Sequence, residues 1–363
     1  RDLVRSRGLG DVYKRQDYII VGFGFAGSSL IHLLEKNKKS FVVFNDNPTP
    51  VTTVAGAMFN PIILKRFTPV WKAQEQMTLL LPFFREIEKK LQTSFLYKVR
   101  VLRKFTSVEE KNNWFVASDK PILSEYLSTD VLQEVSPYIK TPFGVGEVLH
   151  TGMVNTRILI PAYREKLLKE EKLLEEKFDY DALELLEEGV RYRGITAKRI
   201  VFCEGYGMVD NPFFRALPMV GSKGELLNFE ADMLQLEGVV KSDGFIAPLG
   251  GNAFKIGTTY DNDDKDPSPT SGGREILEQK LRQLISCPYR ITGQVAGIRP
   301  TVRDRRPLVG VHPKYKDLFI LNGLGTHGAL LAPYTASALY DFIEEGKPLD
   351  KEMNIVRHYH YFE

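Results

Sequence analysis

The sequence predicts an α/β protein of two domains, one of them built on a parallel sheet covered by helices. The chain has 363 residues, 43% of them apolar, which suffices for two buried cores at ~150 residues per domain. Residues 17–46 read DYIIVGFGFAGSSLIHLLEKNKKSFVVFND, where the run YIIV is typical of a buried parallel strand. A helical pattern and a second apolar run, SFVVF, follow. This strand, helix, strand order predicts a Rossmann-like domain.

A glycine motif joins the first predicted strand to the helix. Gly22, Gly24 and Gly27 have the GxGxxG spacing, which allows a tight turn, close approach of a pyrophosphate and packing of helix on strand. The helix N-terminus offers free N–H groups to phosphates. Asn45 and Asp46 end the second strand, where an acidic residue is expected to bind ribose hydroxyls. The segment therefore predicts a dinucleotide site, for FAD or NAD(P), rather than a chance glycine-rich turn.

Composition excludes several other classes of protein. The sequence contains no run of eighteen apolar residues, so it predicts no membrane span. Residues 1–16 match neither a signal nor a transit peptide, and we expect a non-native or disordered tail there. They hold five of the 49 basic and two of the 46 acidic residues, so the remaining chain has equal numbers of each. Net charge therefore gives no sign of a nucleic-acid partner.

The chain's two cysteines, Cys203 and Cys287, are far apart and outside any CxxC motif. This argues against a disulfide framework and a structural zinc site, and favours a cytoplasmic protein. The acidic segment DNDDKDPSPT lacks the glycine that a calcium loop requires, so we expect no metal.

Six segments, in this order, resemble motifs of the D-amino-acid oxidase family of FAD-dependent oxidoreductases, which includes glycine and sarcosine oxidases. They are DYIIVGFGFAGSS, VAGAMFNP, KRIVFCEGYG, GFIAPLGGNAFKIGTTYD, AGIRPTVRDRRPLVG and LFILNGLGTHGALLAPYTASAL. The last two are also similar to the C-terminal oxidoreductase domain of the bifunctional enzyme that modifies the tRNA wobble uridine. The resemblance implies FAD rather than NAD(P). Neither cysteine lies in a flavin-attachment motif, so we expect noncovalent FAD.

The resemblance also implies a discontinuous architecture, with a Rossmann-like FAD-binding domain and an α+β substrate domain whose antiparallel sheet is interleaved in sequence. We expect the FAD-binding domain at 17–80, 150–215 and 295–345, the substrate domain at 81–149 and 216–294, and a C-terminal tail at 346–363. Helical spacing is visible at 164–178 and 272–285. Gly250 and Gly251 indicate a hairpin.

Further FAD contacts follow from the resemblance. A second glycine-rich motif leads into an Ala-rich helix, whose N-terminus would face the flavin pyrimidine edge and stabilise negative charge there. The alternative is a glycine turn before a buried helix. The expected cofactor-binding residues are Gly22, Gly24, Phe25, Ala26, Gly27, Asn45, Asp46, Gly56, Met58, Gly205, Gly323, Gly325 and Gly328.

Four residues are candidates for the catalytic centre. Arg299 resembles the arginine that holds the substrate carboxylate, with a structural salt bridge to an acid such as Asp304 as the alternative. Phe245 stands where related oxidases often have a substrate-contacting tyrosine, and it lacks the hydroxyl. Lys255 resembles the lysine with which sarcosine oxidases activate dioxygen, unless it is a water-facing strand residue. His327 either faces the flavin or is structural.

The expected function is oxidation of the C–N bond of an amino acid or secondary amine by hydride transfer to flavin, with dioxygen or a quinone as electron acceptor. An oxidoreductase that modifies the carboxymethylaminomethyl group of tRNA wobble uridine is an alternative, with tRNA as partner. A non-catalytic flavin-binding protein is a third possibility.

Overall fold

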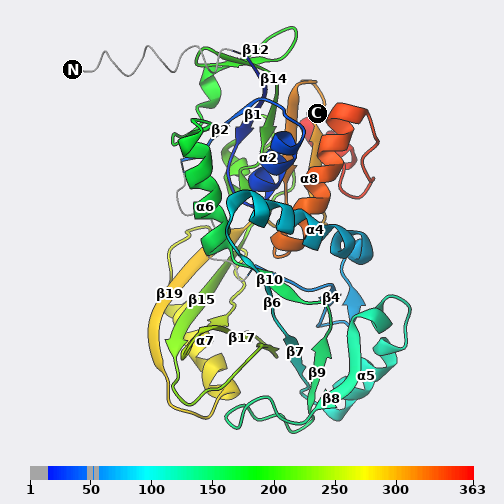
Figure 1. The fold of residues 1–363 in the computed structure, drawn as a ribbon, viewed down its shortest axis with the longest axis vertical. Helices are drawn as coiled ribbons and strands as arrows, with labels where there is room; N and C mark the ends of the chain where they lie inside the picture. The colour runs from blue at the N-terminus through cyan, green and yellow to red at the C-terminus, as the bar shows by residue number, and fades with distance from the viewer. Residues whose placement is uncertain (1–14, 47–51, 53–56) are drawn as a thin grey trace, which may run out of the picture.

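The computed structural model describes residues 15–46, 52 and 57–363, which form two large sheets (Figure 1). One sheet and its helices occupy the upper half of the view, and the other sheet occupies the lower half. A small sheet lies near their junction and consists of β3 (Met58–Phe59), β10 (Gly152–Val154) and β6 (Leu96–Lys98). Among the described residues, no helix has the length and apolar character needed to cross a bilayer.

The upper sheet has the order β11-β2-β1-β14-β13-β12, and β21 pairs with β14 and β20. Neighbours from β11 to β14, and the pair β14 and β21, are parallel. Its strands are β1 (Arg15–Val21), β2 (Phe41–Phe44), β11 (Leu173–Leu174), β12 (Leu183–Leu185), β13 (Val190–Tyr192), β14 (Ile195–Phe202), β20 (Leu308–Val311) and β21 (Leu318–Asn322).

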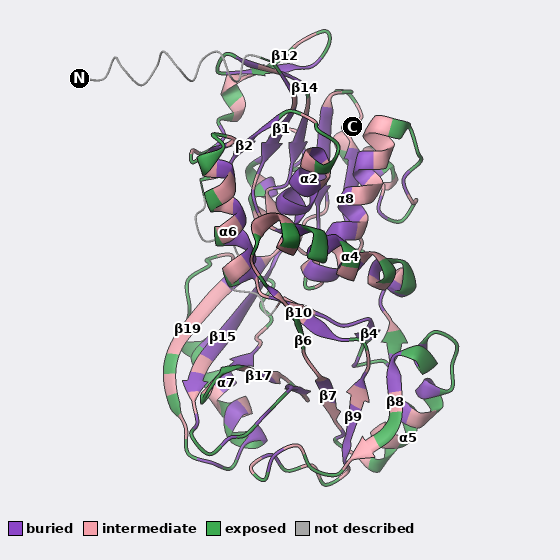
Figure 2. Cartoon of the chain, in the orientation of Figure 1, coloured by how far each residue is buried: buried purple, intermediate pink, exposed green. Residues whose placement is uncertain are grey.

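Both faces of this sheet are covered, as a run of apolar strand residues requires. Tyr18 and Ile20 of β1 point into a core shared with four helices, whereas Ile19 and Val21 point into a core on the opposite face. Figure 2 shows these central strands buried. The four helices are α2 (Phe25–Lys36), α4 (Ala73–Leu91), α6 (Thr156–Lys169) and α8 (Gly328–Glu345).

The lower sheet has the order β19-β15-β18-β17-β16-β7-β9-β8 and is antiparallel except for the pair β16 and β7. Helices α5 and α7 pack against it. Its elements are β7 (Val101–Lys104), α5 (Val108–Ser118), β8 (Leu127–Leu132), β9 (Val145–Val148), β15 (Ser222–Glu230), β16 (Val239–Lys241), β17 (Phe245–Gly250), β18 (Ala253–Gly257), α7 (Ser271–Leu284) and β19 (Arg290–Arg299).

Short elements complete the chain. They are β4 (Ile62–Ile63), β5 (Thr68–Pro69), and the 3₁₀ helices η1 (Leu123–Glu125), η2 (Tyr180–Ala182), η3 (Gly205–Asp210) and η4 (Ile355–Phe362). Helix η4 packs on the upper sheet through the fully buried Ile355, so the C-terminal segment is part of the core.

The predicted α/β fold is confirmed, with local differences from the sequence analysis. The hairpin at Gly250 and Gly251 is present, and Gly251 has φ +58°. The helical pattern at 164–178 is correct only as far as Lys169, because Leu173–Leu174 leave the helix to extend the upper sheet beside β2. Strand β1 begins at Arg15, inside the segment expected to be a tail.

The element boundaries also bear on the expected division into domains. Helix α4 crosses residue 80 and packs against α8 of the upper half. Strand β19 crosses residue 295 as one continuous strand of the lower sheet. The upper half therefore includes all of α4, and the lower sheet extends to Arg299.

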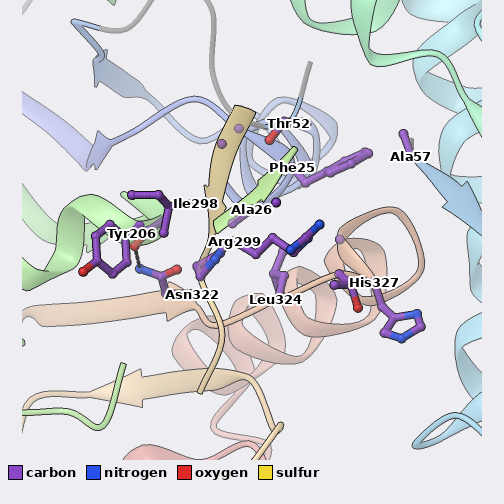
Figure 3. A pocket seen from close by; sticks show the side chains of 18 of the residues that line it. Phe25, Ala26, Thr52, Ala57, Tyr206, Ile298, Arg299, Asn322, Leu324 and His327 are labelled. Carbon is purple, nitrogen blue, oxygen red and sulfur yellow. Dashed lines mark hydrogen bonds between the residues drawn. The ribbon is translucent and has the colours of Figure 1, made fainter. Parts of the chain in front are cut away.

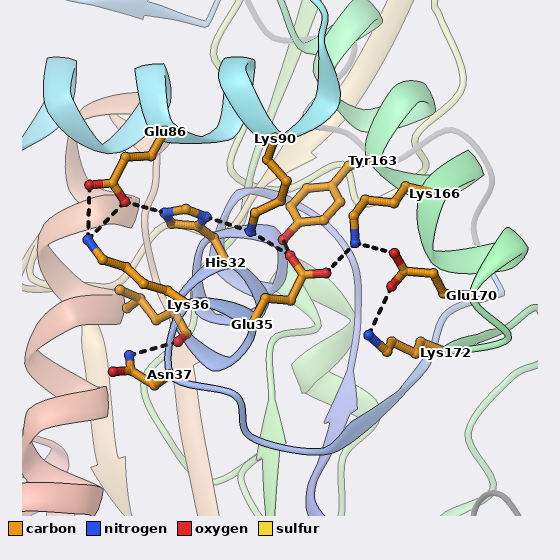
Figure 4. Close-up of polar contacts among 11 residues, drawn as sticks. His32, Glu35, Lys36, Asn37, Glu86, Lys90, Tyr163, Lys166, Glu170 and Lys172 are labelled. Carbon is orange, nitrogen blue, oxygen red and sulfur yellow. Dashed lines mark hydrogen bonds and ion pairs between the residues drawn. The ribbon is translucent and has the colours of Figure 1, made fainter.

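A polar network fastens α2 to α4 and α6 (Figure 4). The Glu35 carboxylate accepts hydrogen bonds from Lys90 Nζ, Lys166 Nζ and the Tyr163 hydroxyl, all at 2.6 Å. Burial alone would raise the pKa of Glu35, but these donors outweigh it and hold the pKa below its usual range. His32 accepts from Lys90 through Nδ1, and burial and this cation lower its pKa to about 4.

We predict that Glu35→Ala lowers the free energy of unfolding by about 2–4 kcal/mol, because it leaves the partly buried Lys90 without its carboxylate and the Tyr163 hydroxyl without its acceptor, while Lys166 keeps Glu170. Urea denaturation measures the change. The matched control is Glu86→Ala, whose side chain is 46% exposed and should contribute less than ~1 kcal/mol. Equal losses in the two variants would show that the network does not depend on Glu35.

Candidate active site

A cavity of about 1750 Å³ extends between the two halves of the molecule. Its walls include the turn after β1, the end of β2, the start of α8 and one face of the lower sheet. Figure 3 shows Arg299 and Leu324 between Tyr206 on one side and His327 on the other. The cavity therefore joins the glycine motifs to the segment that carries the predicted catalytic residues.

The backbone of the first glycine motif explains its residue types. Gly22 has φ +98°, and a Cβ there would lie 2.5 Å from the Cys203 carbonyl oxygen. A Cβ on Gly27 would lie 2.2 Å from the Gly22 carbonyl oxygen, so only glycine lets α2 approach β1 this closely. Gly24 is the N-cap of α2 and provides no side-chain cap, which leaves the helix N–H groups directed to the cavity.

Helix α8 begins at the same cavity and is also uncapped. Its N-cap, His327, makes no side-chain cap, whereas Ser107, Asn155 and Thr270 cap α5, α6 and α7 through their side chains. Burial and the neighbouring Lys241 ammonium lower the pKa of His327 to about 4. The imidazole is therefore neutral at pH 7.

The end of β2 faces the same space. Asn45 Oδ1 accepts a hydrogen bond from the Phe23 N–H at 3.2 Å, and Asp46 lines the cavity. Opposite them, Glu204 accepts hydrogen bonds from the Tyr180 hydroxyl and, at 2.7 Å, from Asn211 Nδ2. Burial raises the pKa of Glu204 to about 7, and the two hydrogen bonds only partly oppose this shift. Sequence reasoning missed Glu204: it lies in the segment KRIVFCEGYG, but nothing in that pattern indicated a buried carboxylate.

Arg299 lies at the end of β19 and is half-buried. Its guanidinium donates to Thr258 Oγ1 at 2.5 Å and lies 4.7 Å from the centre of the Tyr260 ring. It lies over Gly224, where a Cβ would be 1.8 Å from Nη2. Among the described residues, no carboxylate forms an ion pair with Arg299.

The alternative reading of Arg299, a salt bridge to Asp304, is wrong. Asp304 accepts from Arg357 Nε at 2.9 Å, and His358 lies 3.4 Å away. Burial lowers the pKa of Arg299 from its ordinary value, and the neighbouring Tyr260 only partly opposes this shift.

Lys255 is placed differently from Arg299. It is 7% exposed, so it is not a water-facing strand residue, and it is not part of the cavity wall. Its strand neighbours Phe254 and Ile256 pack under α7, so Lys255 lies on the opposite face, with Gly257. Burial and Arg157 lower its pKa to about 8.

Most of the predicted site residues line one cavity. Three predicted residues, Gly27, Gly323 and Lys255, do not line the cavity, and Gly56 lies outside the described residues. The predicted residues that line the cavity are Gly22, Gly24, Phe25, Ala26, Asn45, Asp46, Met58, Gly205, Phe245, Arg299, Gly325, His327 and Gly328. No group of three His, Cys, Asp or Glu residues in the described part of the chain is arranged to hold a metal ion.

These residues fit a bound dinucleotide. A long cavity runs past two uncapped helix N-termini, and a Cβ on Gly205 or Gly325 would meet nothing within 4 Å, so ligand atoms can approach the backbone there. Cys203 and Cys287 are free and buried, and burial raises the pKa of both thiols.

Curated relatives align with part of the chain. A glycine oxidase of Bacillus subtilis is 27% identical over 155 residues, which is 41% of this chain and 41% of the relative. A tRNA 5-methylaminomethyl-2-thiouridine biosynthesis bifunctional protein of Marinobacter nauticus is 26% identical over 168 residues, 42% of this chain and 26% of the relative. The alignments thus span about two fifths or less of these relatives.

Solved structures share the whole fold. Glycine oxidase from Geobacillus kaustophilus superposes with a TM-score of 0.77 at 20% identity, covering 94% of this chain and 97% of that one. Iminodiacetate oxidase from Chelativorans sp. BNC1 also has a TM-score of 0.77, at 17% identity, covering 92% and 96%. Residues 17–341 match the family of FAD dependent oxidoreductases. The chain therefore belongs to this family and is an FAD-dependent oxidoreductase.

Proposed function

We propose that the enzyme oxidises the C–N bond of a small amine that carries a carboxylate, such as an amino acid or secondary amine. The observation that carries this proposal is Arg299, a half-buried guanidinium that faces the cavity without an acidic partner in the described structure. A buried cation is costly unless an anion compensates for it, and a guanidinium fork matches a carboxylate through two charge-assisted hydrogen bonds.

Different residues along the cavity would bind the cofactor and the substrate. When bound, FAD supplies the acceptor for the hydride on the carbon next to nitrogen. Gly22 and Gly24 would hold its pyrophosphate, and the N–H groups at the start of α8 would stabilise negative charge on the flavin. Arg299 orients the substrate carboxylate, and the Phe245 ring forms apolar wall beside Gly257. We expect FAD to be noncovalent.

Lys255 remains a candidate for promoting oxidation by dioxygen, as opposed to electron transfer to a quinone. Its buried position on the cavity-facing side of β18 supports this role, whereas its absence from the cavity wall requires it to act from behind the first layer of residues.

The second candidate function is modification of a carboxymethylaminomethyl group on tRNA wobble uridine. The alignment with the bifunctional tRNA biosynthesis protein supports it, since Arg299 suits any carboxylate on a secondary amine. It ranks second because the chain has a formal net charge of only +3, which provides little general attraction for nucleic acid.

An anaerobic titration tests the proposed function. The FAD-loaded protein is mixed with sarcosine, glycine and a set of D-amino acids while its visible absorbance is recorded. At least one amine should bleach the flavin, as dithionite does in the positive control. If none does and tRNA that carries carboxymethylaminomethyluridine bleaches it, the second candidate replaces the first.

We predict that Arg299→Met raises the KM for the best carboxylate-bearing amine about 100-fold, because two charge-assisted hydrogen bonds are lost. Arg299→Lys should recover part of the affinity through its charge but not the fork geometry. Steady-state kinetics measure both variants, and the visible spectrum measures FAD content, which should not change. An unaltered KM would remove Arg299 from the substrate site.

Glu204 should make the stability of the protein depend on pH. Because the folded-state pKa of Glu204 is about 7 and its unfolded value is 4.5, the folded protein holds an extra proton between these pH values. This contribution to stability is present below pH 4.5 and is lost as pH rises through 7. Glu204→Gln should remove this pH dependence, which amounts to about 3 kcal/mol.

Urea denaturation of wild type and Glu204→Gln between pH 4.5 and 8, at equal FAD load, measures the difference between their pH profiles. Parallel profiles would show that Glu204 is ionised throughout this range.

A further inference from the structure

We propose that the substrate of this enzyme is a dicarboxylic amine, and that Lys241 binds its second carboxylate. The inference rests on the proposed function, since Arg299 is taken to bind the first carboxylate. It is carried by the position of Lys241 on the cavity wall and by the absence of an acidic partner for its ammonium among the described residues.

Lys241 belongs to the same face of the lower sheet as the other substrate-side residues. In the strand register it lies between Arg103 of β7 and Phe245 of β17, and Phe245 in turn pairs with Gly257 of β18. Residues directly opposite one another in neighbouring strands share a face. All four residues line the cavity, so together they form part of its wall.

The neighbouring charges leave Lys241 as the uncompensated cation in this row. Arg103 is paired with Glu110, to which its Nε donates at 2.8 Å. Lys280, another cavity cation, lies 3.3 Å from the Asp243 carboxylate. No ion pair or hydrogen bond of the Lys241 side chain is found within the described ranges.

The environment of Lys241 is costly for a cation. Burial and the nearby Arg103 lower the pKa of Lys241 to about 8, so the ammonium is still mostly protonated at pH 7. His327, which faces it from α8, is neutral at that pH and cannot compensate the charge. A ligand carboxylate would compensate it, as the partly buried position requires.

The distance between Arg299 and Lys241 indicates that the two cations bind different anionic groups. Arg299 is bonded to Thr258, the residue after Gly257, and Lys241 is two strands away from Gly257. Two strand spacings place the backbones about 10 Å apart. The Phe245 ring lies against Gly257, since a Cβ on Gly257 would be 2.8 Å from that ring, and Phe245 belongs to the strand between Lys241 and Gly257. One substrate carboxylate bound in the fork of Arg299 therefore leaves Lys241 for a second anionic group.

Equilibrium binding to the FAD-loaded enzyme tests this inference independently of turnover. Glutarate and butyrate differ by one carboxylate and have no amine to oxidise. Wild type should bind glutarate about 10–100-fold more tightly than butyrate, as measured by perturbation of the flavin spectrum. Lys241→Met should abolish most of this preference, whereas Lys198→Met, which removes an exposed lysine of β14 paired with Asp17, should retain it. Equal affinities in wild type would overturn the inference without any variant.

Kinetics separate this inference from the proposed function. With iminodiacetate and sarcosine as paired substrates, Lys241→Met should raise the KM for iminodiacetate about 10–100-fold and the KM for sarcosine less than about 2-fold. Equal increases for both would overturn the role of Lys241 while the amine oxidation stands. If no amine reduces the flavin but glutarate still binds in preference to butyrate through Lys241, the proposed function fails and the second anion site stands.

Discussion

The arrangement of the substrate side depends on the guanidinium of Arg299, which forms no ion pair with a carboxylate of the described residues. The antiparallel register of β15 and β19 places it over Gly224, where any side chain would collide with Nη2. Thr258 and the Tyr260 ring position the group without neutralising it. No described residue pairs a carboxylate with this group, and under the proposed function a substrate carboxylate would supply the negative charge.

On the nucleotide side of the cavity, backbone N–H groups rather than side chains are available to bind the ligand. Helices α2 and α8 both begin at the cavity without a side-chain cap, so their N–H groups can bind a ligand. The network around Glu35 holds α4 and α6 against α2, and α8 packs on α2 as well. The positions of the two helix N-termini are thus fixed by contacts far from the ligand.

Charge is distributed unevenly along the cavity. Asp46 and Glu204 lie beside the glycine turn, whereas Arg103, Lys241 and Arg299 come from the lower sheet. This division suits a cofactor whose ribose hydroxyls need acceptors at one end and an anionic substrate at the other.

The features that sequence reasoning predicted are local ones. Strand β1, the glycine turn and α2 form one continuous segment, whose pattern and conformational demands can be read from neighbouring residues. Arg299 could be predicted because it lies in a family motif, whereas only the fold shows that no carboxylate of the described residues pairs with it. Lys241 lies outside the six family-like segments, and Glu204 lies inside one of them without a pattern that marks its burial. Their environment comes from strands and helices distant in sequence, such as α8 beside Lys241, so sequence alone did not identify them. Strand β11 was not predicted, because its two leucines stand in a charged run and form a strand only by pairing with the edge of β2.

A crystal structure of the FAD-loaded enzyme with a non-oxidisable carboxylate such as glutarate would show whether Arg299 binds the substrate carboxylate. We expect one carboxylate in bidentate contact with the Arg299 guanidinium, at about 2.8 Å, on the cavity side of Gly224. A carboxylate bound elsewhere, with Arg299 paired to an acidic side chain of the protein, would contradict this expectation.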